Sequence, residues 1–452
     1  MWTMTSQIKN KWSYVLPFVP ALAVFYINLH SVDQGIHVDE VYWIGSTYYY
    51  HLLVEEMDWS HSDWQLLPAR ENPPIGKYLM GGWIDLFGDT ITTPDLIGSF
   101  YLLFPPESGA WGENDDYAKR RAVADRVEPG VAEGVRRNQR IPLRSENLRS
   151  ARGLVLLCGM LCATLICLIG FQCQMRLGGL LAGLGFAAHP IVIDAYNYAL
   201  IDIIALTFSC LTVSVYIRIA FVDSAGGQRG AWAHRRLSLA LSLALAMACG
   251  SKMNALVIVA LGLLLWLFAL GGWARFQSPV SKDVFIIYTG GFTIAFALFV
   301  VLNPAFYRDI IDGLFALFYE HDLTQDVQAT SAHRLHTIPD RYGALGRMVI
   351  HSSVLLLSVN ILALWQGWRI GIVVRHSAPQ TKFIVIVYWW CLACALILLW
   401  LPFEWERYSL PLIPPTMLIL AKTVDELLCY CWHRRGRFVR QTVPEDSVVA
   451  TR

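Results

Sequence analysis

Charged side chains are scarce in this 452-residue chain, because Asp, Glu, Lys and Arg make up only 16% of it. Soluble globular proteins carry about 25%. Hydrophobic residues account for 55%, and the formal net charge is +1. The small net charge excludes a global field that would attract nucleic acid. The composition therefore indicates an integral membrane protein.

Several other features are absent. The ten cysteines lie in or beside apolar runs and none lies in a long hydrophilic segment, which argues against a disulfide framework or a zinc site. We find no internal repeat and no low-complexity tract. The first apolar run lacks a small-residue cleavage pattern, so we interpret it as an uncleaved anchor.

Long apolar runs predict an all-α polytopic membrane protein of about ten transmembrane helices. A span needs about 20 mostly apolar residues. The segment Ala248 to Lys252 is either a tight turn between two spans or a break in one helix, and we favour the turn. The predicted spans are 12–29, 150–171, 177–193, 198–219, 236–251, 253–270, 284–302, 347–365, 383–401 and 408–422.

The distribution of Lys and Arg predicts the orientation. With the N-terminus inside, most basic residues fall in cytoplasmic segments, and short loops on the other face hold only Lys252 and Arg407. Residues 1–452 then form a single membrane domain with two long outer loops, 30–149 and 303–346. Residues 423–452 form a short, basic, partly disordered cytoplasmic tail. The first outer loop is expected to contain short interfacial helices.

Unusual polar residues gather on the outer face of this topology. The first motif, His37-Val38-Asp39-Glu40, stands where the chain leaves the first span. An acid at this position suits a general base within reach of a membrane-borne substrate. The alternative is a solvated pair of acids beside an aromatic belt.

A second motif, Glu71-Asn72-Pro73-Pro74-Ile75-Gly76-Lys77-Tyr78, combines two prolines and a glycine that fix a bend. Such a bend can place Lys77 against a phosphate. In the alternative interpretation the motif is ordinary loop punctuation, and Lys77 extends toward lipid head groups.

Together these motifs resemble the dolichyl-phosphate-mannose protein mannosyltransferases and their bacterial relatives, including the lipid A aminoarabinose transferases. The resemblance continues along the chain in four short segments. These are Arg149-Ser150-Ala151-Arg152, Tyr198-Ala199-Leu200-Ile201-Asp202, Gly250-Ser251-Lys252-Met253-Asn254 and Glu406-Arg407-Tyr408-Ser409-Leu410-Pro411. This chain has Asn72 where many relatives have His or Lys, and an insertion at about 105–147.

The resemblance implies the glycosyltransferase C fold and transfer of a sugar from a polyprenyl-phosphate carrier. Asp39 is then the base, with inversion at the anomeric carbon, and Glu40 orients the acceptor or tunes Asp39. The expected ligands of the donor phosphate are Lys77, Lys252 and Arg407. Asn72, Asp202, His189 and Asp194 are expected to bind substrate. His189 and Asp194 are also candidates to complete a divalent-cation site with Asp39 or Glu40.

Mannose is the favoured sugar, while aminoarabinose, arabinose or glucose fits the same residues. The expected partners are the polyprenyl-phosphate sugar, a protein or a lipid or glycan acceptor, and membrane lipids, without nucleic acid. A bacterial plasma membrane with the site facing the periplasm is the expected location, because the luminal domain of the eukaryotic enzymes is missing. The alternatives are a transporter or lipid flippase and a scaffold. Against transport, we find no paired half-repeats.

Overall fold

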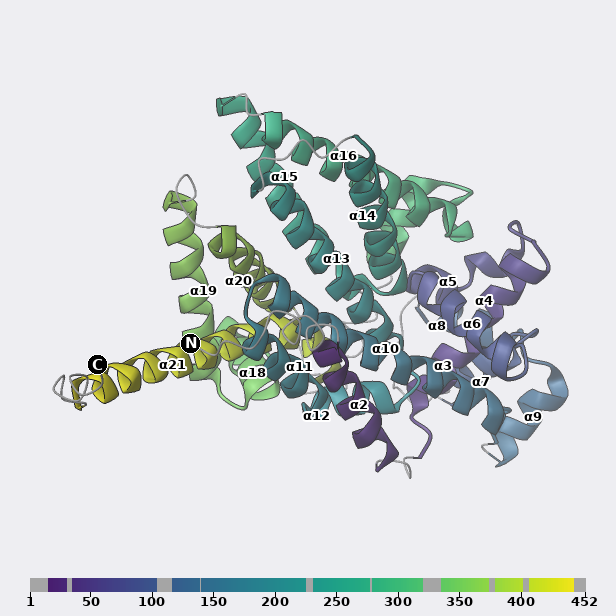
Figure 1. The fold of residues 1–452 in the computed structure, drawn as a ribbon. Helices are drawn as coiled ribbons and strands as arrows, with labels where there is room; N and C mark the ends of the chain where they lie inside the picture. Colours follow the sequence, from purple (N-terminus) through teal and green to yellow (C-terminus); the bar gives the residue numbers. More distant parts are fainter. Residues whose placement is uncertain are drawn as a thin grey trace.

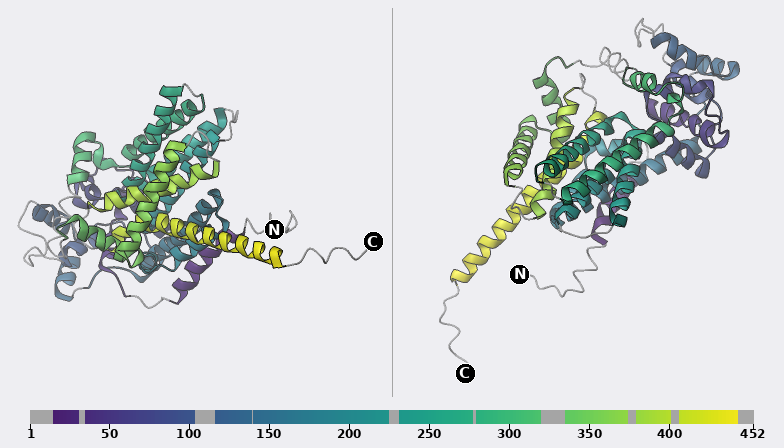
Figure 2. Two further views of the ribbon diagram at one scale, coloured as in Figure 1. Left: turned by 90° about the vertical axis from the view of Figure 1, so that its left-hand side faces the viewer. Right: turned by 90° about the horizontal axis from the view of Figure 1, so that it is seen from above.

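The computed structural model describes residues 15–30, 35–103, 116–138, 140–224, 231–276, 279–319, 335–373, 379–400 and 406–442. All regular elements in these ranges are helical, as predicted. Figure 1 shows a body of long helices with a group of shorter helices, α3 to α9, at one end. Figure 2 shows α21 projecting away from the body toward the C-terminus.

The first hydrophilic segment folds into short helices, as expected for that part of the chain. Each helix is too short to cross a bilayer, and α7 packs against α3, α8 and α9. These elements are α3 (Val38–Gly45), α4 (Tyr48–Tyr50), η2 (His51–Glu55), η3 (Ser62–Gln65), α5 (Leu67–Glu71), α6 (Ile75–Phe87), α7 (Asp95–Leu103), α8 (Asp116–Ala124) and α9 (Pro129–Asn138).

The rest of the chain forms the body. Its elements are η1 (Leu16–Phe18), α2 (Val19–Leu29), α10 (Ser145–Gln172), α11 (Arg176–Ala187), α12 (Pro190–Asn197), α13 (Ile201–Ser224), α14 (Ala231–Ser251), η5 (Met253–Ala255), α15 (Leu256–Phe276), α16 (Pro279–Val301), η6 (Pro304–Phe306), α18 (Ile338–Ile350), α19 (Ser353–Val373), α20 (Pro379–Leu398), η7 (Glu406–Leu412) and α21 (Ile413–Thr442). Each of the ten ranges predicted from hydropathy falls on one or more of these elements.

Within the described residues, three helical segments are long and apolar enough to cross a membrane unaided: Ser145–Gln172, Ile201–Ala220 and Lys282–Val301. Two bent helix pairs raise this number to as many as five if each pair is one span. The first pair bends by 62° where Pro190 begins α12. The second bends by 94° at His351, whose φ of 54° ends α18.

Two local predictions can be compared directly with the structure. The expected turn at Lys252 is confirmed, because α14 ends at Ser251, Lys252 is extended and a short 3-10 turn precedes α15. The predicted cytoplasmic tail differs, because α21 continues as a helix to Thr442. The pair between Lys422 and Glu426, four residues apart, supports this extension. Residues 443–452 lie outside the described part of the chain.

Helices α10 and α13 form the centre of the body. Helix α10 packs against α2, α6, α11 and α13, and α13 also contacts α14 and α20. Most of the apolar window of α13 is buried inside the protein, whereas that of α16 is largely uncovered. The central helices thus carry polar groups at their ends on a rigid frame, while peripheral helices present apolar faces outward.

Candidate active site

A capping box starts α3 and sets the directions of its two acids. The His37 amide donates to the Glu40 carboxylate at 2.8 Å, and the Asp39 amide donates to His37 Nδ1 at 3.1 Å. Acids in the first turn are also stabilised by the positive end of the helix dipole. Glu40 is fully buried, while Asp39 stays partly exposed.

Glu40 joins three segments of the chain. Its carboxylate accepts hydrogen bonds from Arg152 Nε at 2.7 Å and Arg152 Nη2 at 2.8 Å, and from the Ala199 amide at 2.8 Å. Arg152 also donates to the Gly35 carbonyl at 2.8 Å. These contacts tie the start of α3 to α10 and to the chain before α13. With these partners, Glu40 holds the neighbouring Asp39 in place.

Asp39 forms an ion pair with Arg407 at the start of η7. About a fifth of each side chain is exposed, so this pair faces an opening in the otherwise buried surroundings. The guanidinium carbon of Arg407 lies 5.6 Å from the centroid of the Tyr408 ring. A guanidinium offers a planar fork of donors that fits carboxylate and phosphate oxygens alike.

Lys252 forms a second, more deeply buried ion pair with Asp202. The Lys252 ammonium lies 2.5 Å from Asp202 Oδ1, and both side chains are nearly inaccessible. The ammonium also lies 5.7 Å from the Trp43 ring centroid and 5.3 Å from that of Tyr408. Asp202 Oδ2 is buried and has no hydrogen-bond partner among the described residues. Asp202 stands in the first turn of α13, where the helix dipole favours an acid.

The two ion pairs meet at Tyr408, because both cations lie against its ring. We call Asp39, Arg407, Lys252 and Asp202 the charge quartet. Its members come from α3, η7, the turn before η5 and α13, and all four are candidate site residues predicted from the sequence. Positioned cations of this kind can bind a phosphate. Beside the quartet, a cavity of about 20 Å³ is lined by Asp202, Lys252 and Leu410 among others.

Lys77 lies on α6, close to the same region, but its ammonium has other partners. It is fully buried, donates to the carbonyls of Pro68 and Asn72, and lies 5.5 Å from the Tyr49 ring centroid. Burial lowers the pKa of Lys77 from 10.5 to about 7, and the nearby Glu71 opposes this shift. The structure therefore gives Lys77 contacts inside the first hydrophilic segment.

The motif that contains Lys77 and the segment Gly250-Ser251-Lys252 do pack closely against each other. A Cβ atom on Gly250 would lie 2.2 Å from Ile75 Cδ1, and one on Gly76 would lie 3.3 Å from Ser251 Cβ. Glycine at both positions lets the start of α6 pack directly on the end of α14. Asn72, from the same motif, donates to the Tyr42 hydroxyl at 3.4 Å.

His189 and Asp194 are placed differently from the quartet. The His189 ring is buried and its Nε2 lies 2.9 Å from the Val349 carbonyl, while Asp194 is exposed on α12. In the part of the chain that the structure describes, no three His, Cys, Asp or Glu side chains are close enough to hold a metal ion. These residues do not assemble the candidate cation site with Asp39 or Glu40.

Three further residues, for which the sequence predicted no role, complete the arrangement: Arg152, Tyr408 and Trp43. Arg152 and Tyr408 had appeared only within the family resemblance. An arginine near the start of a long apolar helix is the signal for Arg152, because such a charge needs a buried partner. Trp43 lacks such a signal, because it follows Tyr42 in an aromatic segment that reads as an interfacial belt.

Comparisons with known proteins concern the family and the fold. Residues 141–306 match the family model described as dolichyl-phosphate-mannose-protein mannosyltransferase. No curated protein sequence matches the chain.

Among solved structures, ArnT from Cupriavidus metallidurans in the apo state is similar at a TM-score of 0.50 and 16% identity, over 93% of this chain and 61% of that one. The archaeal oligosaccharyltransferase AglB from Archaeoglobus fulgidus, in complex with an inhibitory peptide and a dolichol-phosphate, is similar at 0.52 and 13%, over 96% and 52%. The apo oligosaccharyltransferase from Archaeoglobus fulgidus gives 0.53 and 10%, over 96% and 53%.

This chain thus spans between about half and three fifths of the length of those proteins. Identities this low establish the fold alone. The chain has the glycosyltransferase C fold of polyprenyl-phosphate-sugar dependent membrane glycosyltransferases, and its residues 141–306 resemble the dolichyl-phosphate-mannose-protein mannosyltransferases, as its motifs indicated.

Proposed function

We propose that this protein transfers a sugar from a polyprenyl-phosphate carrier to a hydroxyl-bearing acceptor at the charge quartet. The observation that carries the proposal is the pairing of Asp39 with Arg407 beside Lys252, contributed by three segments distant in sequence. One accessible carboxylate beside two cations suits a reaction in which the leaving group is a phosphate.

The cations serve the leaving group. A phosphate is already stable as an anion near neutral pH, so its departure requires positive charge and not a protonated acid. A glycosidase, in contrast, uses two carboxyl groups that flank the scissile bond. Arg407, the more exposed cation, binds the donor phosphate through its planar fork, and Lys252 adds positive charge beside the Tyr408 ring. One preorganised contact of this kind is worth about 3 kcal/mol in the transition state.

Asp39 serves the nucleophile. When the donor phosphate binds Arg407 and displaces Asp39 from it, the Asp39 carboxylate is free to accept the proton of the acceptor hydroxyl. The acceptor oxygen bonds to the anomeric carbon as the bond from that carbon to the phosphate oxygen breaks. The electron pair leaves with the polyprenyl phosphate, and the configuration inverts. Glu40, held by Arg152, positions Asp39, and Asp202 positions Lys252.

Of the remaining candidates, Lys77 and Asn72 have supporting places in the proposal. Lys77 joins the start of α6 to the carbonyls of Pro68 and Asn72, and Asn72 joins this segment to Tyr42 on α3, the helix whose first turn carries Asp39. His189, bound to the Val349 carbonyl, and the exposed Asp194 lie apart from the quartet and take no part in this step. No step requires a divalent cation.

The proposal includes ten spans with both termini in the cytoplasm. Residues 30–149 and 303–346 then form outer loops, and the quartet opens to the non-cytoplasmic face. The long apolar helices and the fold support a multi-pass protein, and the few basic residues in the short outer loops support this orientation. The proposed location is a bacterial plasma membrane with the site facing the periplasm.

Mannose is the proposed sugar, supported by the family model over residues 141–306. The dolichol-phosphate and peptide named with the archaeal neighbour support a lipid-phosphate donor and, in general terms, a protein acceptor. A lipid or glycan acceptor is the alternative within the same chemistry.

The experiment that tests the proposal uses purified protein reconstituted in liposomes with polyprenyl-phosphate mannose. Radiolabelled sugar should appear in peptide, glycolipid or oligosaccharide acceptors added outside, and donor should be consumed in proportion. Movement of intact donor between leaflets without cleavage would overturn the proposal in favour of a flippase. For the variant Arg407→Met, which removes a cation of the quartet, the matched control is Arg144→Met, because Arg144 forms an exposed ion pair with Asp89.

A further inference from the structure

A second site lies apart from the charge quartet, between two segments distant in sequence. An open groove of about 500 Å³ is bounded by residues 57–65 on one side and by residues 304–308 on the other. Its polar and aromatic lining includes Asp58, Trp59, His61, Gln65, Tyr307 and Arg308. The volume lies in the range of small-molecule sites, which is about 300–1,000 Å³.

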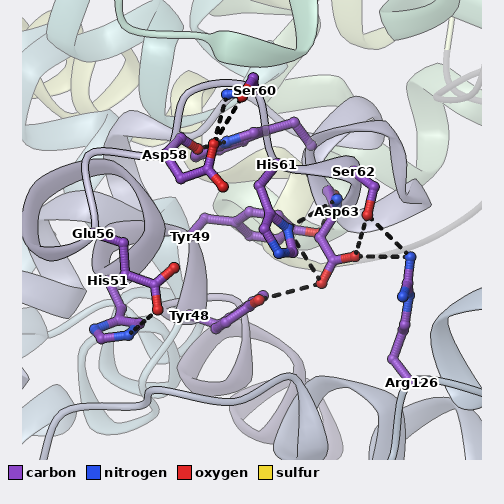
Figure 3. Close-up of polar contacts among 11 residues, drawn as sticks. Tyr48, Tyr49, His51, Glu56, Asp58, Ser60, His61, Ser62, Asp63 and Arg126 are labelled. Atoms are coloured by element: carbon purple, nitrogen blue, oxygen red, sulfur yellow. Dashed lines mark hydrogen bonds and ion pairs between the residues drawn. The ribbon is translucent and has the colours of Figure 1, made fainter.

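The wall formed by residues 58–63 is rigid. Figure 3 shows Asp63 at its centre, and this carboxylate is almost fully buried. It accepts a hydrogen bond from the Tyr48 hydroxyl at 3.2 Å and forms an ion pair with Arg126 at 3.1 Å. The Tyr49 hydroxyl donates to the Asp63 carbonyl, and the Asp63 amide donates to His61 Nδ1. These contacts fix the backbone that carries His61.

The turn at residues 57–60 is also fixed. Met57 has a φ of 52°, a left-handed conformation that reverses the chain after η2. Asp58 then accepts hydrogen bonds from the amide and hydroxyl of Ser60, and the Trp64 indole donates to the Asp58 carbonyl at 2.9 Å. A groove with a fixed backbone loses little entropy when it binds a ligand.

Two aromatic side chains leave ring surface uncovered in this groove. Trp59 is 51% exposed and Tyr307 is 41% exposed, and their ring centroids lie 6.1 Å apart in an edge-to-face arrangement. The face of an aromatic ring is partly negative and attracts polarised C–H groups. Asp58, through the carboxylate oxygen that Ser60 does not use, and Arg308 add an acceptor and donors for the hydroxyls of a ligand. Ring faces beside such groups fit a pyranose, which has one C–H face and a rim of hydroxyls.

A peptide fits this groove less well. One mode of peptide recognition adds an extended strand at a sheet edge that supplies a row of backbone groups. The described walls of the groove are the irregular segment 57–61, the turns η3 and η6 and residues 307–308, and they offer no such edge. A lipid chain would need an apolar lining, whereas Asp58, His61 and Arg308 are polar.

The groove is connected to the quartet through its second wall. Ala305 and Phe306 pack in one apolar cluster with Met253, the residue after Lys252. Gln65 donates to the Ala305 carbonyl at 3.5 Å, which joins the two walls. We propose that this groove binds a saccharide and holds the glycan portion of the acceptor. The acceptor role, though not the binding itself, rests on the function proposed above.

Saccharide binding is tested with purified protein in detergent, by calorimetric titration with mannobiose, cellobiose and diacetylchitobiose. At least one disaccharide should bind saturably. Trp59→Ala and Tyr307→Ala should each weaken that binding by about tenfold or more, and Trp59→Phe by less than about threefold. Trp400→Ala, which removes an exposed tryptophan outside the groove, should bind as the wild type does. Equal thermal midpoints would show that the variants fold.

The proposal would be overturned if none of the disaccharides bound saturably. It would also be overturned if wild type, Trp59→Ala and Tyr307→Ala bound a disaccharide with equal affinity. Binding of a Ser/Thr peptide alone, lost in the same variants, would also overturn it. A transfer assay separates this proposal from the proposed function. Disaccharide binding without sugar transfer to any acceptor would support the saccharide-binding groove and contradict the proposed transferase function. Sugar transfer without disaccharide binding would support the transferase function and contradict the saccharide-binding groove.

Discussion

Asp39 and Arg407 lie 368 positions apart in the chain and form an ion pair at the opening of the charge quartet. The start of α3 therefore depends on η7, near the far end of the described chain, for its charge partner. In the proposed mechanism, the donor phosphate replaces the Asp39 carboxylate as the partner of the Arg407 guanidinium. In the proposed mechanism this pair is the resting state, in which the base and the phosphate ligand hold each other in position.

Replacing Arg407 separates charge from geometry. Arg407→Met should lower the turnover rate about 100-fold and weaken binding of polyprenyl phosphate, because the phosphate loses its accessible cation. Arg407→Lys should recover only part of the activity, since an ammonium lacks the planar fork. Product formation and binding of the lipid phosphate should be measured together. Unchanged binding in Arg407→Met would contradict the assignment.

Removing the partner of Glu40 should affect the whole protein. Arg152→Met leaves a fully buried carboxylate without its cation, and breaking a buried pair in this way costs about 3–5 kcal/mol. The thermal midpoint in detergent should fall by several degrees. Arg121→Met, which breaks an exposed pair with Asp125, should change stability by less than about 1 kcal/mol. Equal midpoints for both variants would show that Glu40 does not depend on Arg152.

The close approach of α6 to α14 predicts that Gly250→Ala destabilises the protein, and Gly134→Ala on α9 is the control. Gly250→Ala places a Cβ atom against Ile75 and should destabilise the protein by about 1–3 kcal/mol. Gly134→Ala, on α9, meets no atom within 4 Å and should be neutral or stabilise by about 0.5–1 kcal/mol through helix propensity. Thermal unfolding of both variants measures the difference. A stable Gly250→Ala variant would mean that the helices do not touch there.

Lys77 predicts a pH dependence of stability. Its pKa is about 7 in the folded protein and 10.5 ordinarily. Between these values the unfolded chain binds more protons than the folded protein does, so this residue makes stability rise with pH across the window. The thermal midpoint should therefore rise more from pH 7 to pH 9 in wild type than in Lys77→Met. Parallel profiles would contradict the burial of an ammonium at this position.

The positions of the long helices and of the charged motifs were predictable from the sequence. Hydropathy located α10 and α13, and the short polar motif at Lys252 predicted the turn that ends α14. The bend at Pro190 and the continuation of α21 to Thr442 were not predicted. A hydropathy window averages across a proline break, and it also ends where an apolar helix becomes amphipathic.

Within the site, the sequence identified the four members of the quartet but not their pairing. Acids and bases that lie hundreds of residues apart carry no local sign of which will meet. The pair of Glu40 with Arg152 depends on the relative placement of α3 and α10, which only tertiary packing defines. Lys77 was expected at the phosphate, and its contacts with the Pro68 and Asn72 carbonyls depend on the fold of α5 and α6.

The central claim, that Asp39 is the base, is tested most directly by sugar transfer from polyprenyl-phosphate mannose in wild type, Asp39→Asn and the control Glu133→Gln. Glu133 is an exposed acid on α9. Asp39→Asn should lose between about 100-fold and 10,000-fold in turnover while it still binds the donor, because a positioned base contributes a factor of this size. Glu133→Gln should match wild type. Transfer by Asp39→Asn at the wild-type rate would contradict the account and remove Asp39 from the mechanism.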